Sequence, residues 1–158
     1  MDPLTRTRDR AAGPAPGAVR IRRAAAAAAV LTVGAGLGLR AVAAGSVAKY
    51  GGDALYTVLL LTLIVLAAPR MRPAKAAASA LAASWAVELL QLSTLPAELS
   101  QHSTVARLVL GSTFNAPDLL WYAVGAAAGW LLHTAMSRGA VARADRRTEG
   151  PVRAHGAP

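Results

Sequence analysis

Four long runs that contain almost no charged residues restrict how this chain can fold. Ala24–Leu39 and Ala54–Ala68 carry no charge, while Ala76–Leu92 and Pro117–Met136 each contain one acidic residue. At about 1.5 Å per residue, helices of this length approach the roughly 30 Å hydrocarbon core of a bilayer. We therefore predict an all-α integral membrane four-helix bundle formed by residues 24–136, with spans at about 24–44, 53–68, 74–92 and 117–136.

The segments outside the four runs are basic and rich in turn residues. Residues 1–23 and 137–158 are predicted to be a disordered leader and a disordered tail. The connection between spans three and four is expected to break at Pro96, and Thr104–Leu110 has the spacing of a short interfacial or re-entrant helix. A cleaved signal peptide ending near Ala41-Val42-Ala43 is the alternative to a retained first span.

Composition excludes several classes of protein. Hydrophobic residues make up 54% of the 158 residues, and the absence of cysteine excludes a disulfide framework, a thiolate metal site and a cysteine nucleophile. The net charge of +9 does not indicate nucleic acid as a partner, because the cations lie between apolar runs and form no folded basic face. Membrane lipids are the expected partners.

The distribution of lysine and arginine predicts the orientation. The leader, the 69–75 loop and the tail together hold 14 of these residues, whereas the other two loops hold Arg40, Lys49 and Arg107. Cytoplasmic loops of membrane proteins carry the excess of positive charge. Both termini and the 69–75 loop are therefore expected in the cytoplasm. An even number of spans agrees with this, since it puts both termini on the same side.

The acidic residues outside the tails all fall in the outer half of the predicted bundle. They are Asp53, Glu88, Glu98 and Asp118. Ser84, Glu88 and Gln91 share one face of the third span. Because a carboxylate inside a membrane helix is costly, Glu88 is expected either to pair with Arg107 or Arg40, or to serve a ligand or a proton.

Two of these acids have a simpler explanation. Asp53 and Asp118 each lie in a first helical turn, where a carboxylate complements the helix dipole. Asn115-Ala116-Pro117-Asp118 resembles a capping box with Asn115 as the cap. On the same span, Gly125 and Gly129 form a small-xxx-small pair that predicts close helix packing. Packing within the monomer is favoured, and a homo-oligomer is the alternative.

Templates for catalysis and metal binding are not found. The chain has no Gly-x-Ser-x-Gly elbow, no phosphate-binding loop and no His-Glu-x-x-His pair. His102, His133 and His155 are predicted at different depths, so they do not converge on a metal. We expect no metal and no cofactor, and we assign no catalytic residue.

An ordered set of short motifs resembles a known family. The set comprises Gly52-Asp53-Ala54-Leu55-Tyr56, Glu88-Leu89-Leu90-Gln91-Leu92, Arg107, Leu110-Gly111, Phe114, Asp118-Leu119-Leu120-Trp121-Tyr122 and Gly125. It resembles the bacterial membrane family of unknown function DUF2809, and more distantly the VanZ-like proteins, some of which are linked to glycopeptide resistance. The resemblance implies a small inner-membrane protein and directs attention to Asp53, Glu88, Gln91, Arg107 and Asp118.

Three hypotheses follow. The favoured one is a non-enzymatic protein whose outward-facing charged pocket binds a lipid or cell-wall precursor headgroup through Asp53, Glu88 and Asp118, balanced by Arg107 and Arg40, with Gln91 and Asn115 as hydrogen-bonding groups. A small permease or proton-coupled transporter using Glu88 is the alternative, and it requires a polar path toward the cytoplasm. An intramembrane enzyme requires Glu88 and Asp118 within reach of one another.

Overall fold

The chain folds into an all-α bundle, and the computed structural model describes residues 16–105, 109 and 113–148. No β-strand occurs among the described residues. The predicted fold class is confirmed, with a short helix between the third and fourth long helices. The described helices are α1 (Pro16–Val42), α2 (Gly45–Ala67), α3 (Pro73–Leu90), α4 (Leu95–His102) and α6 (Ala116–Thr148).

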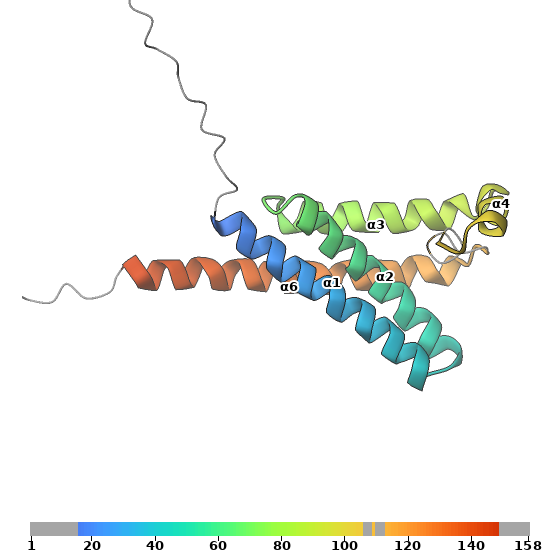
Figure 1. Ribbon diagram of the computed structural model, residues 1–158, viewed down its shortest axis with the longest axis horizontal. Coiled ribbons are helices and arrows are strands. Elements are labelled where there is room, and N and C mark those ends of the chain that lie inside the picture. Colours follow the sequence, from blue (N-terminus) through green and yellow to red (C-terminus); the bar gives the residue numbers. More distant parts are fainter. Residues whose placement is uncertain (1–15, 106–108, 110–112, 149–158) are drawn as a thin grey trace, which may run out of the picture.

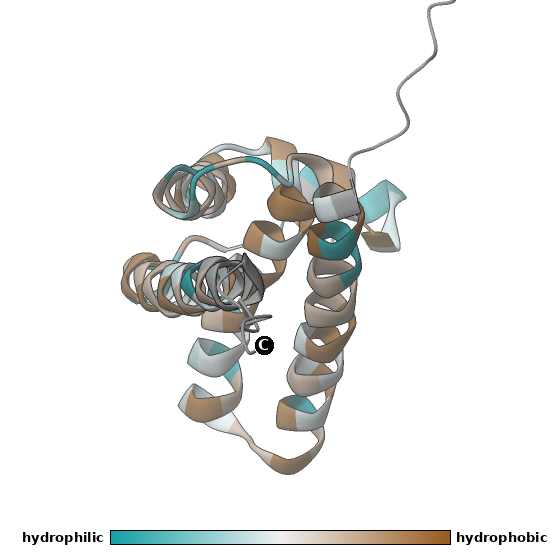
Figure 2. Cartoon of the chain, turned by 90° about the vertical axis from the view of Figure 1, so that its left-hand side faces the viewer, coloured by the Kyte–Doolittle hydropathy of each residue, from teal (hydrophilic) through white to brown (hydrophobic). Residues whose placement is uncertain are grey.

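The long helices form two antiparallel pairs (Figure 1). α1 and α2 make a hairpin, and α3 and α6 lie beside each other and cross the hairpin at an angle (Figures 1 and 2). α2 is the central element, since it packs against α1, α3 and α6. The turn between α1 and α2 depends on Gly45, whose φ of +60° is a backbone conformation that other residues rarely adopt.

Three of the described helices are long and apolar enough to cross a membrane, over Gly17–Val42, Gly45–Ala67 and Ala116–Gly139. The exposed surface of α1 is correspondingly apolar, with Val30 and Leu31 each 72% exposed. α3 has only 18 residues, and Lys75 and Glu88 make it less apolar. The third span, predicted over residues 74–92, therefore stays a prediction.

Small residues bring the helices close together. Ala76 and Ala80 of α3 are fully buried against Leu61 and Val65 of α2. On α6, a Cβ atom at Gly125 would lie 2.2 Å from the backbone oxygen of Ala54. The glycine therefore lets α6 contact the backbone of α2 directly, within the monomer.

The helices extend beyond the predicted spans. α1 begins at Pro16, inside the predicted leader 1–23, and α6 continues to Thr148, inside the predicted tail 137–158. Both extensions are rich in arginine, which favours helix, and proline is well suited to the start of a helix. α2 begins at Gly45, eight residues before the predicted start of its span. Residues 1–15 and 149–158 lie outside the described chain.

Pro96 begins a helix instead of breaking the chain. It is buried within the first two positions of α4, where its missing N–H is not needed by the helix. The predicted helix at Thr104–Leu110, including Arg107, lies partly outside the described residues, so its geometry is not tested.

Gly125→Ala is expected to lower the free energy of unfolding in detergent by about 1–3 kcal/mol, because the new methyl group would overlap the backbone of α2. Gly129→Ala should cost less, because its nearest neighbour is the end of the flexible Leu61 side chain, at 2.8 Å. Gly34→Ala is the control: nothing lies within 4 Å of the added Cβ, and the higher helix propensity of alanine should leave stability unchanged or raised. Equal effects at Gly34 and Gly125 would contradict the packing argument.

Candidate functional site

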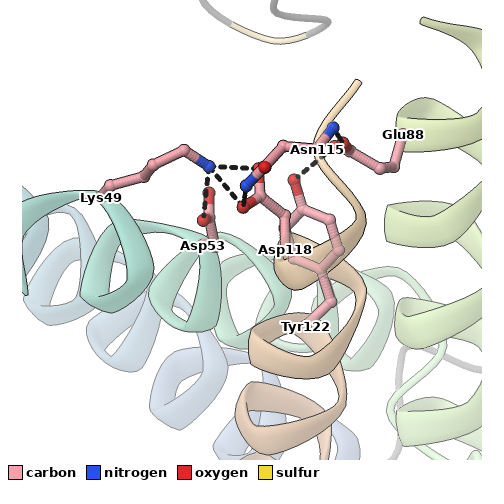
Figure 3. A network of polar contacts seen from close by, with 6 residues as sticks. All are labelled: Lys49, Asp53, Glu88, Asn115, Asp118 and Tyr122. Atoms are coloured by element: carbon pink, nitrogen blue, oxygen red, sulfur yellow. Dashed lines mark hydrogen bonds and ion pairs between the residues drawn. The ribbon is translucent and has the colours of Figure 1, made fainter. Parts of the chain in front are cut away.

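Six polar side chains from α2, α3 and the start of α6 meet at one end of the bundle (Figure 3). We call them the polar cluster: Lys49, Asp53, Glu88, Asn115, Asp118 and Tyr122.

Glu88 is the most deeply buried member, with 1% of its surface exposed. Its Oε1 accepts the backbone N–H of Asn115 at 2.5 Å, and its Oε2 accepts the Tyr122 hydroxyl at 3.1 Å. These two hydrogen bonds replace part of the hydrogen bonding with water that a carboxylate loses when it is buried. Glu88 therefore joins α3 to the first turns of α6.

Asp118 is the second buried acid, with its side chain 7% exposed. It accepts hydrogen bonds from the side-chain amide of Asn115 and from the ammonium group of Lys49. The backbone N–H of Asn115, which a capping box would direct to Asp118, is bonded to Glu88 instead. Glu88 of α3 thus accepts the free N–H at the N-terminal end of α6, which leaves Asp118 available to Lys49.

Lys49 and Asp53 form the accessible side of the cluster. They lie one turn apart on α2, with side chains 46% and 20% exposed and Nζ 3.7 Å from Oδ2 of Asp53. This Oδ2 atom is buried, and the described residues offer it no hydrogen-bond partner. The cluster holds three carboxyl groups and one ammonium group, so its described charges do not balance if all three carboxyl groups are ionised.

Aromatic rings and hydroxyl groups surround the cluster. Tyr50 stacks on Trp121 with ring centroids 5.5 Å apart, which holds the start of α2 against α6. Nearer the bundle centre, the buried hydroxyls of Thr57 and Ser84 bond to each other at 2.8 Å, and Ser84 also donates to the carbonyl of Ala80. Both hydroxyls therefore form hydrogen bonds within α2 and α3, and they do not extend the polar cluster toward the other end of the bundle.

The structure brings together four of the predicted site residues, Asp53, Glu88, Asn115 and Asp118. Gln91 caps the C-terminal end of α3, where its backbone N–H donates to the carbonyl of Glu88. The predicted cations are not those of the described cluster, since Arg40 is exposed at the end of α1 and Arg107 lies outside the described residues.

Lys49 supplies the described cation, and sequence reasoning missed it. We expected the second helix to begin at residue 53, which placed Lys49 in a loop. Because α2 begins at Gly45, Lys49 and Asp53 lie four residues apart on the same helical face. Extending the helix by two turns would have revealed this spacing.

The bonding pattern limits the chemistry of the cluster. Asn115 contacts both Glu88 and Asp118, so these carboxyl groups lie close together. Each of them already accepts two or more hydrogen bonds within the protein, which takes up part of its lone-pair capacity. Within the described ranges, no group of three or more His, Cys, Asp or Glu residues is arranged to hold a metal ion.

Comparison with known families identifies the family of the chain. A model described as protein of unknown function (DUF2809) matches residues 42–126, more than half of the chain. The chain belongs to the DUF2809 family. The matched region contains all six residues of the polar cluster and omits nearly all of α1 and the second half of α6. No curated protein and no solved structure matches the chain.

Tyr122→Phe is expected to lower the free energy of unfolding by about 1–3 kcal/mol, because buried Glu88 loses one of its two donors. Tyr56→Phe is the matched control: this neighbouring tyrosine packs 6.1 Å from Tyr122, and its hydroxyl makes no hydrogen bond within the described chain. Denaturant unfolding in detergent measures both variants. If they lose the same stability, the bond from Tyr122 to Glu88 contributes nothing.

Proposed function

We propose that this chain is a multi-pass protein of the bacterial inner membrane, with both termini in the cytoplasm, that binds the headgroup of an amphiphile at its polar cluster. The antiparallel helices support this topology, because they put the start of α1, the α2–α3 loop and the end of α6 at one end (Figure 1). The polar cluster lies at the opposite end. The excess of positive charge at the first end supports a cytoplasmic location for that end.

α3 is the one long described helix that is not among the three long and apolar enough to cross a membrane, so its crossing is the part of this topology that most needs a test. The chain has no cysteine, which makes single-cysteine labelling clean. Cysteine placed at exposed Ser93, just after α3, should react with a membrane-impermeant maleimide in intact cells. Cysteine at exposed Ala74, at the start of α3, should react only after permeabilisation. Labelling of both positions from the same side would exclude the crossing.

The binding proposal rests on the accessible side of the cluster. Asp53 carries a buried carboxyl oxygen without a hydrogen-bond donor, and Lys49 beside it is nearly half exposed. A ligand bearing a protonated amine would supply the missing donor and the missing positive charge. Lys49 could at the same time meet a phosphate or carboxylate of that ligand. Zwitterionic lipid headgroups and amine-bearing cell-wall precursors combine these groups.

Glu88 takes no direct part in this proposal. It is buried and accepts two hydrogen bonds within the protein, which fits a role in holding the cluster together. The ligand is therefore expected to contact Asp53 and Lys49, with Glu88 and Tyr122 as positioning residues.

Asp53→Asn is expected to weaken binding of phosphatidylethanolamine about tenfold or more, because a charged acceptor for the ammonium group is lost. Native mass spectrometry of the purified protein measures retained lipid. Phosphatidylcholine should bind weakly to both proteins, since its methylated nitrogen has no N–H to donate. Glu98→Gln, an exposed acid of α4 outside the cluster, is the charge-matched control. Equal lipid retention by wild type, Asp53→Asn and Glu98→Gln would overturn the proposal.

A further inference from the structure

A second site lies at the end of the bundle opposite the polar cluster. It is an open cavity of about 750 Å³ between the start of α1 and the connection from α2 to α3. Its lining includes four cationic side chains and no acidic one. The cations are Arg22 of α1, Arg70 and Arg72 of the connection, and Lys75 in the first turn of α3.

The cavity is suited to an anion. All four cations are exposed, and none of them takes part in an ion pair within the described chain. Three of the described acids, Asp53, Glu88 and Asp118, belong to the polar cluster at the other end. The N-terminus of α3 adds the positive end of a helix dipole beside Lys75. Arginine and lysine around a helix start form a common arrangement for holding phosphate.

The rest of the lining indicates that the phosphate belongs to a lipid. Ala18, Ala68, Pro69 and Met71 provide apolar surface next to the cations. The cavity also sits where helices of membrane-spanning length end, which is the depth of the headgroups. Membrane proteins generally carry positive charge near the cytoplasmic ends of their helices. That general rule explains the presence of the charges, but it does not require charges from two segments to line one cavity.

We propose that this cavity, which we call the basic cavity, binds the phosphate of an anionic lipid headgroup in the cytoplasmic leaflet. Its volume lies within the range of about 300–1,000 Å³ that is typical of ligand sites. Arg22 and Arg70 reach the phosphate from different segments, so the bound lipid also ties α1 to the α2–α3 connection. This inference does not depend on a ligand at the polar cluster.

The test compares two variants that remove the same charge. Arg22→Gln with Arg70→Gln removes two cations from the basic cavity, whereas Arg20→Gln with Arg23→Gln removes two exposed cations of α1 that do not line it. Native mass spectrometry of the full chain should show about tenfold or more loss of phosphatidylglycerol for the first variant only. Equal loss in both variants would reduce the interaction to general electrostatic attraction and overturn the proposal.

Three further arms separate the sources of phosphate and test folding. Phosphatidylcholine, inorganic phosphate and glycerol phosphate should not compete with phosphatidylglycerol, and competition by either soluble phosphate at equal concentration would exclude a lipid-specific site. Arg22→Lys with Arg70→Lys should keep most of the binding. If this charge-preserving variant lost binding as completely as the glutamine variant, the electrostatic account would be overturned. Circular dichroism verifies that each variant is helical.

Discussion

The buried carboxylate of Glu88 is the constraint on which the rest of the bundle depends. An isolated charge in such an environment costs several kcal/mol, and only nearby donors reduce that cost. Here the donors come from the beginning of α6, through the backbone of Asn115 and the hydroxyl of Tyr122. The position of α6 along α3 is therefore tied to a hydrogen-bonding requirement.

The close approach of α6 to α2 depends on the same alignment. Gly125 lies two turns after Asp118 and contacts the backbone of Ala54, which neighbours Asp53. A shift of α6 by one turn would put Trp121 or Gly129 at this contact, depending on its direction, and in either case would separate Asp118 from Lys49. Backbone packing and the ion pair thus select the same register, and such agreement between independent interactions favours a single native arrangement.

Much of this could be predicted from the sequence. Apolar runs and their boundaries revealed four long helices, and the rarity of acids within them singled out Glu88 and Asp118. Periodicity does not reveal that the cation would be Lys49, because helix starts are poorly defined where the flanking residues are alanine, glycine and serine. Nor could it reveal that Glu88 would accept the backbone N–H of Asn115, since that bond joins residues 27 positions apart. Such contacts follow from tertiary packing alone.

The structure also changes which acid is the better candidate for contact with a ligand. In the sequence, Glu88 is conspicuous because burying a carboxylate in an apolar helix costs free energy. In the structure, its burial and its two hydrogen bonds give it a structural role in joining α3 to α6. Substituting it would disturb the end of α6 and Asp118 together, so a loss of binding would not distinguish a ligand contact from a structural defect. Asp53 differs, because its Oδ2 has no hydrogen-bond donor within the described chain and its removal breaks only a 3.7 Å ion pair. The incompletely satisfied group at the edge of the cluster is therefore the better indicator of a ligand.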